Sequence, residues 1–206
     1  MSRFSADSLS RSLASLGVSD DGKLFRLLKQ QHIEAARHYH SDKHISACLQ
    51  QFLDYRSIAE RPAEIEIAFW FHDAIYDTHR NDNEEKSAAL ATQELKKLNV
   101  FADAIERVHQ MILATKTHIP ETPDAAILVD IDLGILGASP EDFENYDIAI
   151  RKEYHWVPET QYKPARANIL EAFLTRSHIY HTAAIRETLE EQARENLARK
   201  IAELRA

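Results

Sequence analysis

Three short segments of this sequence combine histidine with aspartate in ways that could bind a metal ion. Residues 39–44 read Tyr-His-Ser-Asp-Lys-His, residues 71–73 read Phe-His-Asp, and residues 130–133 read Asp-Ile-Asp-Leu. Imidazole nitrogens and carboxylate oxygens are ligands that suit zinc, manganese, iron or magnesium in proteins. A metal site is therefore the first hypothesis for the chemistry of this chain.

The His72-Asp73 pair follows an apolar run, Ile67-Ala68-Phe69-Trp70-Phe71, that we expect to be buried. Buried polar groups must be paired or bound to a metal ion. A His-Asp dipeptide alone is a weak motif, but its position after so large an apolar run favours a metal site.

His40 and His44 are four residues apart, which on a helix would place both imidazoles on one face, one turn apart. One of them could bind the metal ion while the other acts as an acid or base. The alternative interpretation is a pair that caps a helix or faces solvent.

Asp130 and Asp132 follow a second apolar run, Ile127-Leu128-Val129. Surface acids do not usually follow three large aliphatic residues, although two helix-surface acids are the alternative here. A site with two histidines and two aspartates would leave coordination positions open for water, which is typical of a catalytic rather than a structural site.

The elements that must position these residues are expected to be helices. Apolar residues recur at helical spacing almost throughout, and only four glycines and six prolines interrupt them, so we predict an all-α fold. Pro62 suits the first turn of the helix that leads to His72-Asp73, and Asn81-Asp82-Asn83 offers N-caps to the next helix. The other expected helices follow Gly22, run from about 45 to 55, and cover about 101–115, 123–136, 140–153, 159–175 and 182–204.

Size, charge and cysteine content exclude some classes of function. The chain has 206 residues, enough for one domain with a good core, and its net charge of −8 argues against binding of a nucleic-acid polymer. A small anionic substrate stays open, since a metal ion can supply local positive charge. Cys48 is the only cysteine, which rules out an intramolecular disulfide. Neither a signal peptide nor a membrane span is evident, so we expect a cytoplasmic protein without a membrane partner.

The order His…His-Asp…Asp on a helical chain resembles the HD-domain superfamily of metal-dependent phosphohydrolases, with His72-Asp73 as the namesake pair. Residues 39–44 are also similar to the Tyr-His-Asn-x-x-His segment of cyclic-nucleotide phosphodiesterases, with Ser41 in place of the Asn. The resemblance implies that His44 binds the metal ion and that His40 donates a proton to the leaving group. It also implies that Asp132, rather than Asp130, is the final ligand after His72 and Asp73.

A bacterial group of uncharacterised HD phosphohydrolases is more similar still. The shared motifs lie at residues 37–45, 70–77, 83–88, 130–137 and 151–154. The resemblance implies a single HD domain with a core at about 24–140 and additional C-terminal helices at about 141–206. It implies hydrolysis of a nucleotide or another small phosphoester with a divalent ion, which could be Mn, Mg, Zn, Fe, Co or Ni. Cyclic nucleotides are not implied, because the purine clamp of the phosphodiesterases has no evident counterpart.

Four further residues are candidates for roles around this site. Glu84 could orient or deprotonate the attacking water, could bind the metal ion through a bridging water, or could be a charge at the start of a helix. Lys116 could meet phosphate, and His118 could contact the substrate or a second metal ion, or be an ordinary loop residue. Arg151 could grip phosphate with two parallel hydrogen bonds, or could belong to a buried ion-pair group with its neighbours.

Two other functions stay open from the sequence. A di-iron oxygenase of the HD type would need at least two further histidine ligands, for which His109 and His118 are candidates. A non-catalytic HD module that binds a nucleotide or a partner is the other alternative. The amphipathic helix from Thr182 onward could form a homodimer interface as readily as part of a core.

Overall fold

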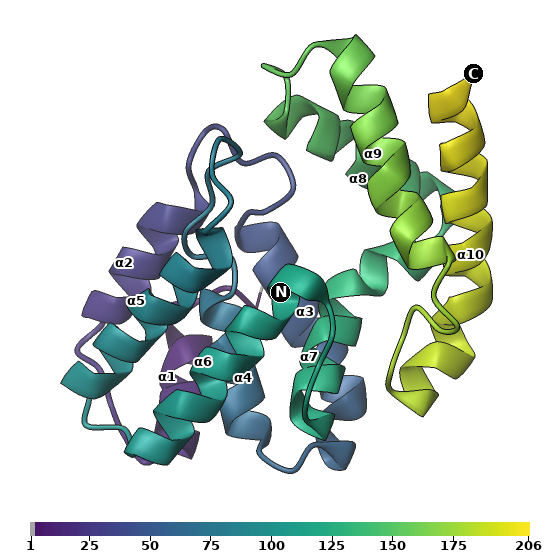
Figure 1. Cartoon of the computed structure of the whole chain (residues 1–206). Helices are drawn as coiled ribbons and strands as arrows, with labels where there is room; N and C mark the ends of the chain where they lie inside the picture. Colours follow the sequence, from purple (N-terminus) through teal and green to yellow (C-terminus); the bar gives the residue numbers. More distant parts are fainter. Residues whose placement is uncertain (1–2) are drawn as a thin grey trace. The chain divides into compact units, whose positions relative to one another are not determined.

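The computed structural model describes residues 3–206, which form helices and no strands, as Figure 1 shows. The prediction of an all-α fold is confirmed. The helices of the described range are α1 (Ala6–Ser15), α2 (Lys23–His32), α3 (Asp42–Tyr55), η1 (Arg56–Ile58), α4 (Pro62–Phe71), α5 (Asn83–Lys97), α6 (Ala102–Thr117), α7 (Pro123–Asp132), η2 (Leu133–Gly137), α8 (Pro140–Glu153), α9 (Glu159–Leu174) and α10 (Ala183–Arg205), where η marks a 3-10 helix.

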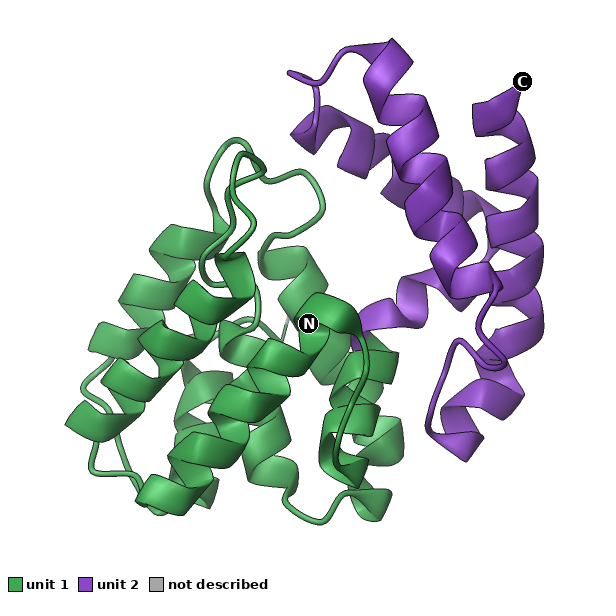
Figure 2. Cartoon of the chain, viewed as in Figure 1, with its two compact units in different colours: residues 1–131 green, residues 132–206 purple. Residues whose placement is uncertain are grey.

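The chain folds as two compact units, residues 1–131 and residues 132–206, coloured separately in Figure 2. The boundary falls at the last residue of α7, Asp132. Assignment of the chain to a single HD domain stays a prediction. No helix within residues 3–206 has both the length and the apolar character needed to cross a membrane.

Helix α4 is the centre of the first unit, where it contacts α1, α3, α5 and α6. A helix that is apolar on all sides is stable only when it is surrounded by protein. Its six completely buried residues are Ile65, Ile67, Ala68, Phe69, Trp70 and Phe71. Because the helix ends at Phe71, the next two residues, His72 and Asp73, emerge from the middle of the core rather than from a surface loop.

Helix α7 has the same apolar character and ends in a similar way. Ile127, Leu128, Val129 and Ile131 are buried, and Asp130 between them has no exposed surface. Pro123 starts the helix and Asp132 ends it. The predicted helix at 123–136 is wrong over its last part, which forms η2. Two glycines within Leu133–Gly137 weaken an α-helix there.

In the second unit, a side chain of α10 donates hydrogen bonds to the backbone at the end of η2. Asn196 Nδ2 donates to the carbonyls of Leu136 and Ala138, each at 2.9 Å, and so satisfies two carbonyls that the α-helix no longer uses. Gly137 is required at this approach, because a Cβ atom there would lie 2.6 Å from the carbonyl oxygen of Leu189. Helices α9 and α10 also pack against each other.

Two local details differ from the sequence expectations. Helix α1 was not expected; its buried apolar residues are only Leu9 and Leu13, too short a stripe to stand out, although Ser5 caps it by accepting from the amide of Ser8. Asp82 occupies the N-cap position of α5, but its side chain does not cap the helix. Its carboxylate instead pairs with Arg80 through two hydrogen bonds of 2.7 Å.

Candidate metal centre

Four side chains from three helix ends converge in the structure. His44 is the third residue of α3, His72 and Asp73 directly follow α4, and Asp132 is the last residue of α7. One ligand atom from each lies within 4.8 Å of all the others, and His44 and His72 are buried. The group could hold a metal ion. These are the four residues predicted as ligands.

The spacing of the ligand atoms tests whether one ion fits among them. The Nε2 atoms of His44 and His72 lie 3.2 Å apart, and Asp73 Oδ2 is 3.2 Å from His72 Nε2 and 3.6 Å from His44 Nε2. Two ligand atoms at about 2.1 Å from one ion lie about 3.0–3.4 Å apart at octahedral or tetrahedral angles. Asp73 Oδ2 is buried and makes no hydrogen bond within the protein, as expected for a ligand atom. The ligand atoms of His44, His72 and Asp73 therefore fit one divalent ion, and Asp132 lies close enough to join them.

The tautomer of His72 is fixed by its other ring nitrogen. His72 Nδ1 lies 3.0 Å from the carbonyl oxygen of Phe69, which can only accept, so Nδ1 carries the proton. Nε2 therefore presents its lone pair to the group. A backbone carbonyl that orients a metal-binding imidazole in this way is a common feature of protein metal sites.

The electrostatics favour an ionised Asp73. Burial alone would raise the pKa of this carboxyl, but the positive charge that the imidazoles of His72, His40 and His44 carry when no ion is bound and they are protonated holds it below its usual range. The carboxylate thus keeps a negative charge that can neutralise part of the charge of a cation.

The carbonyls at the C-terminal end of α4 lack partners within the helix. Side chains provide hydrogen-bond partners for them and for the carbonyls of the turn that follows. His72 Nδ1 donates to Phe69, and His32 Nε2 lies 3.3 Å from the carbonyl oxygen of Trp70. Arg37 donates to the carbonyls of Asp73 and Ala74. The sequence pattern gives no signal for His32, and Arg37 stands out only as part of a shared motif. A spacing pattern in the sequence could not predict either contact with the end of α4, because each contact joins residues more than thirty positions apart.

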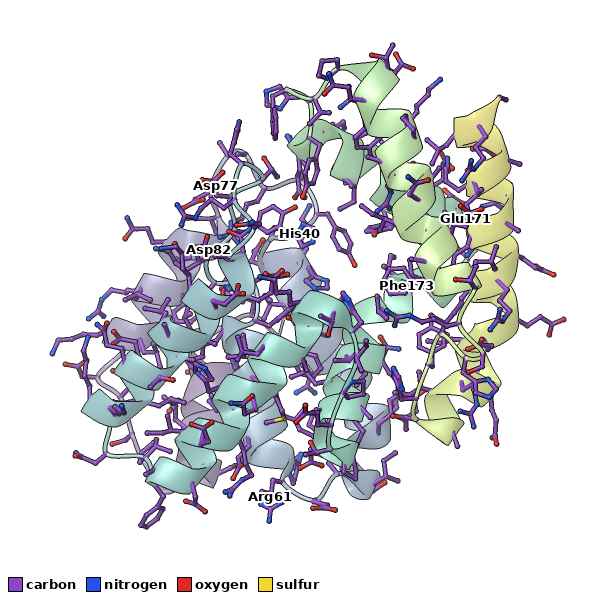
Figure 3. All side chains as sticks on the ribbon, viewed as in Figure 1. His40, Arg61, Asp77, Asp82, Glu171 and Phe173 are labelled. Carbon is purple, nitrogen blue, oxygen red and sulfur yellow. The ribbon has the colours of Figure 1, made fainter. Side chains whose placement is uncertain are left out.

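His40 does not lie on a helix with His44, so that part of the prediction is wrong. Ser41 is the N-cap of α3 and accepts from the amide of Lys43, which places His40 in the preceding loop. The His40 ring stacks on Tyr76 with centroids 4.1 Å apart and lies 6.1 Å from the ring of His44. Figure 3 labels His40 near the loop that carries Asp77, the neighbour of Tyr76. His40 is thus beside the four-residue group but not part of it.

Cys48, the only cysteine of the chain, is a neighbour of the site. Its Sγ lies 3.7 Å from His44 Nε2, one helical turn further along α3, and it is buried. The structure does not include it among the converging ligand atoms.

The other predicted residues lie outside the four-residue group. Glu84 is in the first turn of α5. Lys116 donates to the carbonyl of Asn81 at 2.7 Å and forms an ion pair with Glu85 that raises the pKa of its amine. His118 is the C-cap of α6 in the left-handed conformation, with φ at 53°.

Arg151 and His109 make contacts that favour their structural interpretations. Arg151 belongs to the second unit, where it donates to the carbonyls of Tyr154 (2.6 Å) and Val157 (3.0 Å). Its guanidinium carbon lies 4.5 Å from the centre of the Tyr162 ring. His109 Nδ1 lies 3.0 Å from Thr92 Oγ1, which joins α6 to α5.

No protein-family model, curated protein or solved structure matches the chain.

Proposed function

We propose that this chain is a metal-dependent phosphohydrolase that acts on a nucleotide or another small phosphoester. The observation that carries the proposal is the convergence of His44, His72, Asp73 and Asp132, with a further imidazole, His40, beside them but outside the group. Ligands plus an adjacent proton donor are what metal-assisted hydrolysis requires. The resemblance to HD-domain phosphohydrolases supports the choice of a phosphoester.

In this proposal His44, His72, Asp73 and Asp132 hold a divalent ion. A bound ion would supply Lewis-acid chemistry, through activation of water at neutral pH and neutralisation of charge on a phosphoryl group. Its identity among Mn, Mg, Zn, Fe, Co and Ni stays open, because a mixed set of imidazole and carboxylate ligands suits several of them.

His40 holds the proton for the leaving oxygen. Its imidazole is half-exposed and stacked on Tyr76, so a substrate can reach it while its ring plane stays fixed. Glu84 and His118 are kept as candidates for contacts with water and substrate. Lys116 would have to give up its ion pair with Glu85 before it could bind phosphate. We give Arg151 no role, because its donors already bond two carbonyls.

The decisive experiment joins metal analysis with a panel of phosphoesters. We expect the purified protein to carry or take up a divalent ion and to hydrolyse at least one nucleotide or phosphomonoester. His72→Ala and Asp73→Ala should each lose both properties and keep the helical circular dichroism spectrum. Asp54→Ala, an exposed aspartate on α3, is the matched control and should keep both. Full metal retention in both ligand variants would reject the site.

The same experiment separates the alternatives. Oxygen consumption together with two irons per chain would favour a di-iron oxygenase. Tight nucleotide binding without turnover under any divalent metal would favour a non-catalytic module.

A further inference from the structure

Arg37 connects the loop of His40 to the turn that carries the proposed metal ligands. Arg37 Nη1 donates to the carbonyl of His40 at 3.1 Å and to the carbonyl of Asp73 at 2.5 Å. Nη2 donates to the carbonyl of Ala74 at 3.0 Å. The side chain of Arg37 is 1% exposed. A single buried guanidinium thus bonds three carbonyls from two segments that are more than thirty residues apart in the sequence.

These three carbonyls lie outside the regular helices. Residues 33–41 contain no regular helix, and Asp73 and Ala74 lie beyond the last residue of α4. Backbone carbonyls that are withdrawn from water need partners, and a planar guanidinium with several fixed donors can serve three at once. A lysine amine is one point charge on a flexible chain and cannot reproduce this geometry.

Arg37 bonds the backbone of Asp73 and not its carboxylate. The contact therefore fixes the backbone position of Asp73 and leaves its Oδ2 atom close to His72 and His44. On the other side, the bond to the His40 carbonyl fixes the backbone of the proposed proton donor.

The Tyr76 ring adds a second link between the same two segments. His40 stacks on this ring at 4.1 Å, and the guanidinium carbon of Arg37 lies 5.5 Å from its centre. The ring orients the imidazole of His40, while Arg37 fixes the backbone beneath it. Both contacts set the distance between His40 and the metal ligands.

We infer that Arg37 is a positioning residue that sets the geometry between His40 and the His72-Asp73 turn. The inference about rate rests on the proposed function, while the structural part does not. A misplacement of about 1 Å can cost about 10²-fold in rate, so this distance matters even though Arg37 touches no substrate.

The test compares Arg37→Lys with Arg37→Ala and with Arg11→Lys, the same change at an exposed position on α1. Hydrogen–deuterium exchange should become at least about tenfold faster in residues 33–41 of Arg37→Lys, with α3 and the interior of α4 unchanged. With a substrate from the phosphoester panel, kcat should fall by about 10²-fold at a temperature well below the unfolding transition, and KM should change by less than about threefold. Arg11→Lys should change neither quantity.

The readouts distinguish the two possible failures. Unchanged exchange in residues 33–41 of both Arg37 variants would overturn the inference. Faster exchange with an unchanged kcat would also overturn it, since Arg37 would then be a structural brace only.

If the wild-type protein hydrolyses no phosphoester, the proposed function fails, and exchange together with metal affinity still decides the inference. In that case we expect metal binding in Arg37→Lys to weaken through the displaced Asp73, and unchanged affinity would overturn the positioning role. Should Arg37→Ala fail to fold, Arg37→Lys decides alone.

Discussion

The Nε2 atoms of His44 and His72 lie 3.2 Å apart inside the protein, although the two residues come from different helices. His72 cannot donate through Nε2 in its neutral form, because its proton is on Nδ1 and bonds the Phe69 carbonyl. Two nitrogens at this separation, with Asp73 Oδ2 near both, are spaced as the ligand atoms of one metal ion would be. The backbone ends of α3 and α4 bring these three atoms together.

Metal removal should therefore lower stability without unfolding the protein. A ligand present at 100 times its dissociation constant stabilises the folded state by about 2.7 kcal/mol, which corresponds to about 5–10 °C in Tm for a chain of this size. We expect Tm to fall by that amount after chelation and to recover when the ion returns, measured by calorimetry. His44→Ala should show no metal-dependent shift, while Asp54→Ala should keep it. A shift of wild-type size in His44→Ala would contradict the ligand role of His44.

Replacement of His40 should separate metal binding from catalysis. His40 stands outside the group of four, so His40→Ala should bind the ion with unchanged stoichiometry. Loss of a proton donor should reduce kcat by roughly 10²–10⁴-fold. Metal content and turnover measured on one preparation give the result, and a substrate whose leaving group needs no protonation should restore much of the rate. If the variant loses its metal instead, the assigned roles of His40 and His44 are reversed.

The sequence was informative wherever a helix is apolar on all sides. The runs before His72-Asp73 and Asp132 predicted buried helices, and both helices place their final residues in the site. Pro62 at the start of α4 and the bounds of α8 also agree with the prediction.

The failures lie where tertiary contacts decide the backbone. The spacing of His40 and His44 allowed both to lie on one helix face, but α3 begins at Asp42 with Ser41 as its N-cap, so His40 precedes the helix. The roles of Arg37 and His32 at the end of α4 depend on contacts across more than thirty residues, which a periodic pattern cannot reveal. The choice of Asp132 over Asp130 came from family resemblance, since both acids follow the same apolar run.

His32 should make the protein sensitive to acid. Burial, assisted by the positive charge of Arg37, lowers the pKa of His32 to about 3 from 6.5. The unfolded chain binds a proton at this residue below pH about 6.5 while the folded chain does not, so the free energy of unfolding falls as pH drops towards about 3. Protonation of His32 in the unfolded chain lowers the free energy of unfolding by on the order of 4 kcal/mol near pH 3. This contribution does not change with pH above about 7.

The measurement is urea unfolding between pH 7 and pH 4 in the presence of chelator, so that metal release does not contribute. His32→Leu should lose some stability at pH 7, because the Trp70 carbonyl loses its partner, but its stability should depend less on pH. His155→Ala, at an exposed histidine, should keep the wild-type slope. Equal slopes for His32→Leu and the wild type would show that His32 titrates normally in the folded protein.

Two buried tyrosines of the second unit should respond oppositely to the same substitution. The hydroxyl of Tyr162 is buried without a hydrogen-bond partner, and burial raises its pKa to about 12. The hydroxyl of Tyr180 donates to the carbonyl of Leu133 at 3.1 Å. Removing an unsatisfied buried hydroxyl relieves a desolvation penalty, whereas removing a bonded one leaves a buried carbonyl without its donor. Tyr162→Phe should therefore leave the free energy of unfolding unchanged or raise it by up to about 1 kcal/mol, and Tyr180→Phe should lower it by about 1–2 kcal/mol.

Chemical denaturation of both variants beside the wild type measures the difference. A loss in Tyr162→Phe as large as in Tyr180→Phe would mean that an ordered water or another acceptor satisfies Tyr162 in solution.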